Sequence, residues 1–165
     1  MHRTTKGIAA AAILAVSATG CDRGNHPGQI GQPAPTFAVS DGAQSVDLAK
    51  QRGHVVVLVF WATWCAPCLA ELPSLSAMQQ QLPQIHVVTV STDEDADAYK
   101  RFMPTHQVDL VSVHDGPKGA NARYGSFVYP ETYVIDKSGV IRRKFIGAQD
   151  WTSPEIVDFL KKLSA

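Results

Sequence analysis

Two cysteines separated by two residues, Cys65 and Cys68, form the pattern in this sequence with the clearest chemical use. They follow the apolar run 55–60 and precede a segment with helical periodicity. Two sulfurs at this spacing can close a disulfide ring. A helix that starts at the first cysteine points free backbone N–H groups at its sulfur, which favours the nucleophilic thiolate. The pattern therefore predicts a dithiol that exchanges electrons with other disulfides.

A C-x-x-C pair can also be half of a zinc site, or a purely structural disulfide. A zinc site needs a second pair of ligands at a workable spacing. The chain has only one other cysteine, Cys21, and its six histidines are scattered without an H-x-x-x-H spacing. We therefore expect redox chemistry at the pair, with no metal and no cofactor.

Periodicity indicates how the chain positions the pair. The run 55–60 is apolar on both faces, which is typical of a central parallel strand. Behind the cysteines, apolar residues recur at helical spacing, and Pro73 should kink this helix. We predict further strands at 85–90, 110–113, 133–135 and 140–146, further helices at 92–103, 117–124 and from 153 onward, and a small hairpin with strands 36–39 and 45–48. Asp93, Glu94 and Asp95 are expected in the first turn of the helix 92–103, where the helix dipole favours acids.

Length and composition agree with one α/β domain. The chain has 165 residues, of which 45% are hydrophobic, and this suffices for a single buried core. Fifteen basic and fifteen acidic side chains give a formal net charge of zero. Because no long run carries one sign, the sequence shows no electrostatic surface for nucleic acid.

Two segments around these elements resemble the TlpA/ResA-like thioredoxin family. The stretch Phe60–Cys68, read FWATWCAPC, resembles the thioredoxin signature, and Leu69–Pro73 completes a C-x-x-C-x-x-E-x-P pattern. Residues 124–136, which contain Pro130 followed by Glu-Thr-Tyr, are similar to the cis-proline segment of that family and closest in order to its cytochrome c maturation members. The resemblance implies a thioredoxin-like three-layer sandwich with a mixed central sheet and an N-terminal hairpin extension.

The resemblance also implies a function and partners. We expect a periplasmic thiol-disulfide oxidoreductase that reduces protein disulfides, receives electrons from a membrane thiol donor, and acts on apocytochrome c or other protein substrates. Cys65, predicted to be the more exposed cysteine, is the expected nucleophile, and Cys68 is expected to resolve the mixed disulfide. Val59 occupies the position at which cytosolic thioredoxins carry a buried Asp. Glu71, partly desolvated, is therefore the candidate proton acceptor, and a surface-exposed acid is the alternative.

Three further residues are expected to form the substrate-binding surface. A cis peptide before Pro130 would turn the backbone of Tyr129 toward the cysteines, where it could pair with an extended partner segment. Trp64 is expected to pack beside the cysteines and shield them, with burial as an ordinary core aromatic as the alternative. Glu131 is expected to shape the loop, with proton transfer or contact with the partner as the alternative.

The N-terminus has the pattern of an export signal. Arg3 and Lys6 precede an apolar stretch too short to span a membrane comfortably, and small residues follow it. Cys21 then resembles the lipidated cysteine of a bacterial lipobox, although Ala18 stands where leucine is usual. We therefore expect a signal peptide at 1–20, a lipidated cysteine and flexible tether at 21–35, and the folded domain at 36–165. This organisation predicts a lipid anchor on the periplasmic side of the inner membrane, with a soluble periplasmic protein as the alternative.

Two other functions stay open at this point. The segment Gly31–Phe37 also resembles the start of peroxiredoxin-like peroxidases, but no arginine lies near Cys65 in the sequence. The cysteines could also hold copper or serve haem handling, although copper carriers of this fold typically have a C-x-x-x-C spacing.

Overall fold

The structure is a computed structural model that describes residues 29–106, 109–117 and 119–165. The predicted signal peptide 1–20 and the predicted lipidation site Cys21 lie outside the described residues. None of the helices in the described ranges is long and apolar enough to cross a bilayer.

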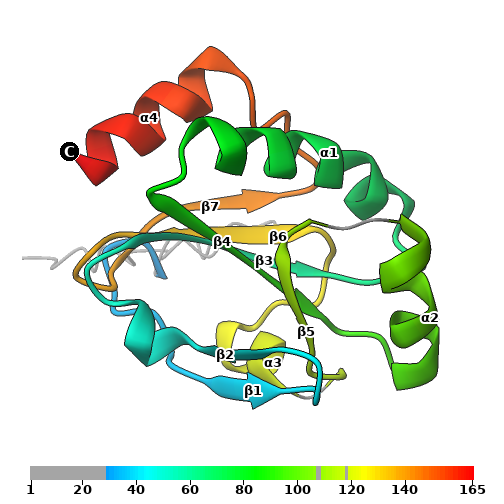
Figure 1. The fold of residues 1–165 in the computed structure, drawn as a ribbon. Helices are drawn as coiled ribbons and strands as arrows, with labels where there is room; N and C mark the ends of the chain where they lie inside the picture. Colours follow the sequence, from blue (N-terminus) through cyan, green and yellow to red (C-terminus); the bar gives the residue numbers. More distant parts are fainter. Residues whose placement is uncertain (1–28, 107–108, 118) are drawn as a thin grey trace, which may run out of the picture.

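A five-stranded mixed sheet forms the centre of the domain. Its strands are β3 (Val55–Trp61), β4 (Ile85–Ser91), β5 (Val111–His114), β6 (Glu131–Ile135) and β7 (Ile141–Ile146), in the spatial order β5-β4-β3-β6-β7. Strands β3, β4 and β5 are parallel, whereas β6 and β7 continue the sheet antiparallel on the other side of β3 (Figure 1). All seven residues of β3 are buried, because both faces of the sheet are covered.

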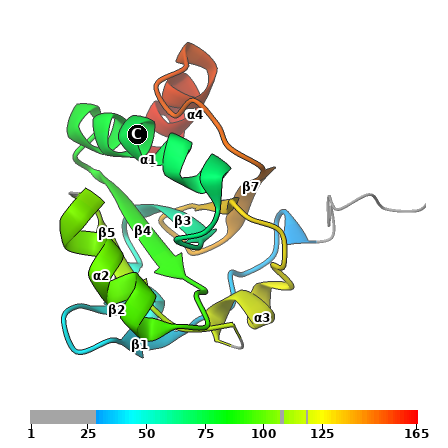
Figure 2. The ribbon, with the colours of Figure 1, turned by 90° about the vertical axis from the view of Figure 1, so that its right-hand side faces the viewer.

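Two layers of other elements cover the sheet. Helices α1 (Ala66–Gln81) and α4 (Pro154–Ser164) lie on one face, and α3 (Ala120–Tyr124) and the hairpin of β1 (Ala38–Ser40) and β2 (Ser45–Asp47) lie on the other (Figures 1 and 2). Helix α2 (Ala96–His106) packs its Tyr99 and Phe102 against Trp61 of β3. Each face therefore has its own apolar core. This is the predicted three-layer α/β sandwich with a mixed sheet and an N-terminal hairpin.

The hairpin also covers an edge of the sheet. In its turn, the side chain of Gln44 accepts the backbone N–H of Ser112 at 3.1 Å, and the side chain of Asp41 accepts that of His114 at 3.1 Å. Both N–H groups belong to β5, the edge strand. The hairpin thereby pairs groups that an uncovered edge would offer to another chain.

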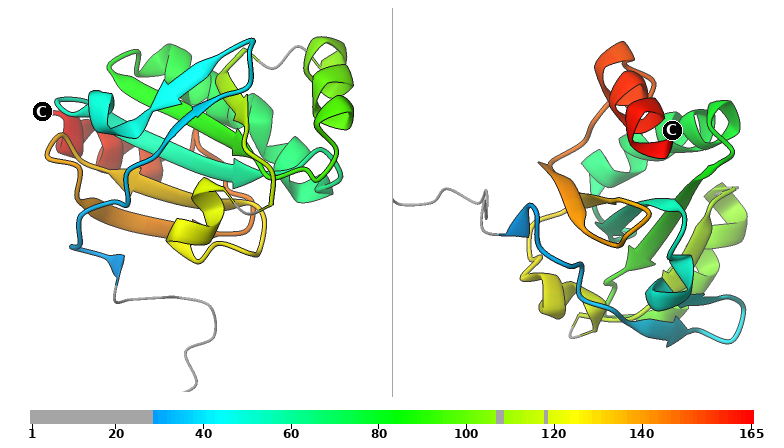
Figure 3. Two further views of the ribbon diagram at one scale, coloured as in Figure 1. Left: turned by 90° about the horizontal axis from the view of Figure 1, so that it is seen from below. Right: turned by 90° about the vertical axis from the view of Figure 1, so that its left-hand side faces the viewer.

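The folded domain begins earlier than predicted. Residues 29–35, expected to be part of the tether, run along the start of β7 toward the hairpin (Figure 3). Gly31 N–H donates to the Ile141 carbonyl at 2.8 Å, and Ile141 N–H donates to the Gln32 carbonyl at 2.9 Å. The sequence rich in Gly, Pro and Gln looked like a linker, but its backbone groups complete the β7 edge. A tether can therefore include at most the residues before Gln29.

The connection from β4 to α2 also differs from the prediction. Helix α2 begins at Ala96 and not at residue 92, so Asp93, Glu94 and Asp95 precede it. The Asp95 carboxylate accepts the N–H of Asp97 at 2.8 Å, which satisfies a free donor at the start of the helix.

Asp93 turns into the protein and joins the ends of β3 and β4. It is only 2% exposed, and its carboxylate accepts Thr63 Oγ1 at 2.7 Å, Thr63 N–H at 3.1 Å and Ser91 Oγ at 2.6 Å. Thr63 stands two residues before Cys65. A buried carboxylate therefore fixes the turn that leads from β3 to the cysteine motif.

We predict that Asp93→Asn destabilises the protein, because the amide presents an N–H₂ group to donors that need an acceptor. Hydrogen bonds to charged groups contribute about 1.5–3 kcal/mol each, and we expect a loss of this size in the free energy of unfolding measured by urea denaturation. Glu94→Gln, which changes the neighbouring exposed acid, is the control and should stay within about 0.5 kcal/mol of the wild type. Equal stability of the two variants would show that Asp93 does not hold the turn.

Candidate active site

Cys65 and Cys68 are joined in a disulfide at the start of α1, just after the end of β3. Their Cα atoms are 5.2 Å apart. Cys65 is the N-cap of α1, and its sulfur accepts the backbone N–H of Cys68 at 3.3 Å. Pro67 lies in the first turn, where a missing N–H costs no helical hydrogen bond. The first sulfur of the pair therefore lies where the helix dipole and free N–H groups stabilise negative charge.

The two cysteines do not differ in exposure as predicted. Cys65 is 4% exposed and Cys68 2%, so both are buried in the disulfide form. A short ring closed within one helical turn places both sulfurs under the same surface, which explains the similar values. What distinguishes Cys65 is its place at the helix cap.

Trp64 and the loop before β6 form an exposed apolar surface beside the motif. Trp64 is 69% exposed, so it is not a core aromatic, and its ring meets the Tyr129 ring edge-on at 6.1 Å. The peptide bond between Tyr129 and Pro130 is cis, as predicted. Phe127 and Val128 in the same loop are 69% and 61% exposed. The structure thus brings Trp64, Tyr129 and the proline loop together, although they are more than sixty residues apart in the chain.

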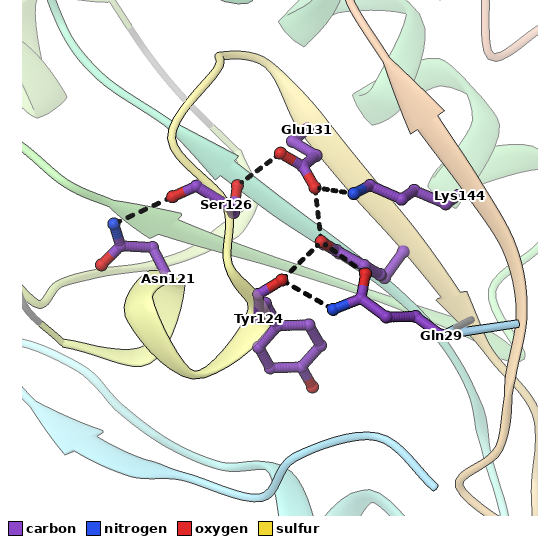
Figure 4. A network of polar contacts seen from close by, with 7 residues as sticks. Gln29, Asn121, Tyr124, Ser126, Glu131 and Lys144 are labelled. Carbon is purple, nitrogen blue, oxygen red and sulfur yellow. Dashed lines mark hydrogen bonds and ion pairs between the residues drawn. The ribbon is translucent and has the colours of Figure 1, made fainter. Parts of the chain in front are cut away.

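A buried polar network holds this loop from inside (Figure 4). The Glu131 carboxylate accepts Lys144 Nζ at 2.5 Å and Ser126 Oγ at 2.9 Å, and the Tyr133 hydroxyl also donates to it. The side chains of Lys144 and Glu131 are 3% and 4% exposed. Burial, together with the neighbouring carboxylate, raises the pKa of Tyr133. Glu131 is therefore a structural anchor of the loop, in agreement with its expected loop-shaping role.

The network extends to both ends of the loop. Asn121 Nδ2 donates to the Ser126 carbonyl and to the Tyr129 hydroxyl, at 3.1 Å each. On the opposite side, Gln29 Nε2 donates to the Tyr124 carbonyl at 2.7 Å. The first described residue and helix α3 thus both help to fix the loop that carries Pro130.

Glu71 is buried and not exposed to solvent. It is 2% exposed on the face of α1 that also carries Cys68, one helical turn earlier. Trp151 Nε1 donates to one carboxylate oxygen at 2.6 Å, and Gln149 N–H donates to the other at 3.2 Å. Burial raises the pKa of Glu71 to about 7, and the two hydrogen bonds partly offset this effect. The structure thus gives the desolvated carboxylate that the sequence pattern predicts.

Val59, at the position of the buried acid of cytosolic thioredoxins, lies in the apolar core that also contains both cysteines and Trp151. The strand therefore places an aliphatic side chain, and no acid, at this position. Glu71 reaches the same core from the helix.

Sequence reasoning missed four residues that shape the site: Asp93, Lys144, Gln149 and Trp151. The last two lie 78 and 80 residues from Glu71 in the chain. No local pattern connects them to the motif. Lys144 is the third of three consecutive basic residues in β7, so the pattern does not single it out as the buried one.

Comparisons with known proteins agree with this site. Residues 30–144 match the model of the AhpC/TSA family. The thiol-disulfide oxidoreductase ResA of Bacillus thuringiensis is 30% identical over 139 residues, which cover 82% of this chain and 79% of the relative. The thiol:disulfide interchange protein DsbE of Pseudomonas aeruginosa is 34% identical over 124 residues, which cover 73% of this chain and 68% of the relative.

A solved structure shares the fold. The crystal structure of the pneumococcal exposed lipoprotein thioredoxin Etrx1 from Streptococcus pneumoniae matches with a TM-score of 0.69 and 26% identity, over 78% of this chain and all of that one. The fold, the joined cysteine pair and these relatives lead to the same assignment. The chain belongs to the AhpC/TSA family, as a thioredoxin-like thiol-disulfide oxidoreductase.

Proposed function

We propose that the protein reduces disulfides of other proteins in the bacterial cell envelope, with Cys65 as nucleophile, Cys68 as resolving thiol and Glu71 as proton acceptor. The observation that carries the proposal is the placement of the Cys65 sulfur at the cap of α1, with a buried carboxylate one turn beyond Cys68 on the same helix.

The reaction has two displacement steps. In the reduced protein the Cys65 thiolate attacks one sulfur of the partner's disulfide. A bond forms between these two sulfurs, the partner's S–S bond breaks, and its second sulfur leaves as a thiolate that takes up a proton. Cys68 then attacks the Cys65 sulfur, so that the internal disulfide forms and the partner leaves with two thiols. Two electrons pass to the partner, and an external thiol donor restores the dithiol.

Glu71 acts in the second step. A thiol must lose its proton to become the attacking thiolate, and Cys68 lies in an apolar core with little access to water. Glu71 is one turn away and has a pKa of about 7, so near neutral pH a fraction of the protein carries the charged form that can accept this proton.

The partner binds over the exposed apolar surface. Trp64 directly precedes Cys65 and its ring meets that of Tyr129, which precedes Pro130, and Phe127 and Val128 add exposed apolar side chains from the same loop. An extended segment of the partner can pair with the backbone before Pro130 in strand fashion and cover Trp64 with an apolar side chain. The loop is held rigidly by the Glu131 network, which lowers the entropy cost of this pairing.

We base the proposed cellular setting on the N-terminal sequence and on the relatives. Residues 1–20 act as the signal peptide, and a lipidated Cys21 anchors the domain to the periplasmic side of the inner membrane. Similarity to an exposed lipoprotein thioredoxin supports the proposal of a lipid anchor. Apocytochrome c is the proposed substrate, because the segment from Pro130 to Tyr133 is similar to that of cytochrome c maturation thioredoxins. A membrane thiol carrier is the proposed electron donor.

The nucleophile assignment can be tested by trapping. Cys68→Ser removes the resolving thiol, so mixed disulfides between Cys65 and partners should accumulate and be identified by mass spectrometry. Cys65→Ser is the matched variant and should trap little. If Cys65→Ser traps partners through Cys68 while Cys68→Ser does not, the two roles are reversed.

The proton-acceptor role predicts a specific pH profile. Because the Glu71 pKa is raised to about 7, its charged form gains population as pH rises through that value. Glu71→Gln should remove this rise and slow the resolving step, on the order of 10²-fold at pH 8, the lower end of the usual effect of a general base. Stopped-flow measurement of mixed-disulfide decay gives the rate.

Glu155→Gln, at an exposed glutamate of α4, is the control and should keep the wild-type profile. An unaltered profile in Glu71→Gln would remove Glu71 from the mechanism.

A further inference from the structure

The loop between β7 and α4 is fastened to α1 at the carboxylate of Glu71. Besides the two N–H donors to that carboxylate, Ser74 ties the same two segments together. Its hydroxyl donates to the Glu71 carbonyl at 2.9 Å and accepts the N–H of Trp151 at 3.3 Å. Helix α1 and the loop are therefore joined by hydrogen bonds around the acid.

Glu71 has no counter-charge in the part of the chain that the structure describes. On the elements packed around it, Arg142, Arg143 and Lys144 of β7 pair with other acids, and Asp158, Lys161 and Lys162 of α4 are exposed. Asp150 accepts a hydrogen bond from Thr152, and Arg143 of β7 pairs with Glu155 of α4 at 3.1 Å. The cysteines, in the same core, are joined. The charged form of Glu71 thus depends on two N–H donors, from Trp151 and Gln149.

The hydrogen bond from Trp151 to Glu71 is not a general property of buried tryptophans in this protein. Trp151 is fully buried, and its ring packs against Phe145 at 5.3 Å, which fixes the direction of the indole N–H. Trp61 is also fully buried, yet its indole N–H meets no acceptor among the described residues. This core therefore accommodates an indole without pairing its N–H, and packing alone does not account for the 2.6 Å bond to Glu71.

We propose that Trp151 is a positioning residue of the exchange reaction, whose indole N–H orients the Glu71 carboxylate and stabilises its charged form for the proton of Cys68. The inference rests on the proposed function, because it assigns Glu71 the acceptor role. It adds that Trp151, which is 80 residues away in the sequence but hydrogen-bonded to Glu71, sets the pH range in which Glu71 can accept a proton.

Removing the indole N–H has a predictable sign. The carboxylate loses a donor to its charged form, so its pKa rises above the present value of about 7 and the group ionises at higher pH. The raised pKa of Glu71 also changes how the free energy of unfolding depends on pH. A carboxyl whose folded pKa lies above its unfolded value stabilises the fold at low pH, and this contribution is lost as pH rises from the unfolded to the folded pKa. In Trp151→Phe that loss should extend to higher pH.

The test uses the oxidised protein, in which no thiol of the pair titrates. The carboxyl carbon of Glu71 is followed by NMR against pH in the wild type, in Trp151→Phe and in Trp61→Phe. We expect Trp151→Phe to raise the Glu71 pKa by about one unit and Trp61→Phe, the matched loss of a buried indole, to leave it unchanged. Replacement of Trp151 by 3-benzothienylalanine, which keeps the bicyclic shape and lacks the N–H, repeats the test with only a small change in volume.

The second readout is the pH profile of mixed-disulfide decay. It should move to higher pH by the same amount in both Trp151 variants. An unchanged Glu71 pKa in these variants overturns the role of Trp151 and leaves the proposed function intact. A raised pKa with an unmoved rate profile overturns the acceptor role of Glu71 and the inference with it.

Discussion

The site depends on one constraint: a carboxylate is held in the same core as a redox disulfide, without a counter-charge among the residues that the structure describes. Burying such a group is unfavourable unless donors replace its water, and here a backbone amide and an indole do so. Burial raises the pKa of Glu71 to about 7, and the two donors offset only part of this effect, so the acid can exchange protons near neutral pH. The α1 helix, the β7–α4 loop and the apolar core around Cys68 all take part in this arrangement.

The remaining parts of the fold hold the two halves of the site in register. Asp93 fixes the end of β3, from which the cysteine turn begins, and the ion pair of Glu131 and Lys144 fixes the start of β6, from which the proline loop emerges. The end of β3 lies beside the start of β6, because the two strands are antiparallel neighbours. The two anchors therefore keep Cys65 and Pro130 at the same end of these strands. Both anchors are buried charged groups with hydrogen-bond or ion-pair partners, so losing one member would leave a buried charge without its partner and would be destabilising.

The elements with strong local signals could be predicted from the sequence. The apolar run of β3, the stripe of α1, the turn at Lys137–Gly139 and the Ser153–Pro154 start of α4 all have patterns that tertiary contacts do not override. The cysteines and Pro130 follow from their motifs. The sequence predicts too early a start for α2, because acids near a helix start look alike whether they cap it or turn inward, as Asp93 does. The composition of 29–35 predicts a linker, because it does not show that these residues pair with the start of β7. Trp151 could not be found because its bond to Glu71 exists only once the chain has folded.

The most direct test of the account is a redox titration of the native protein against dithiothreitol, with the thiols of Cys65 and Cys68 counted at each potential. The account predicts a reversible two-electron equilibrium, with a potential nearer to the roughly −270 mV of thioredoxin than to the roughly −120 mV of a strong oxidant. A disulfide that opens only when the protein unfolds would contradict it.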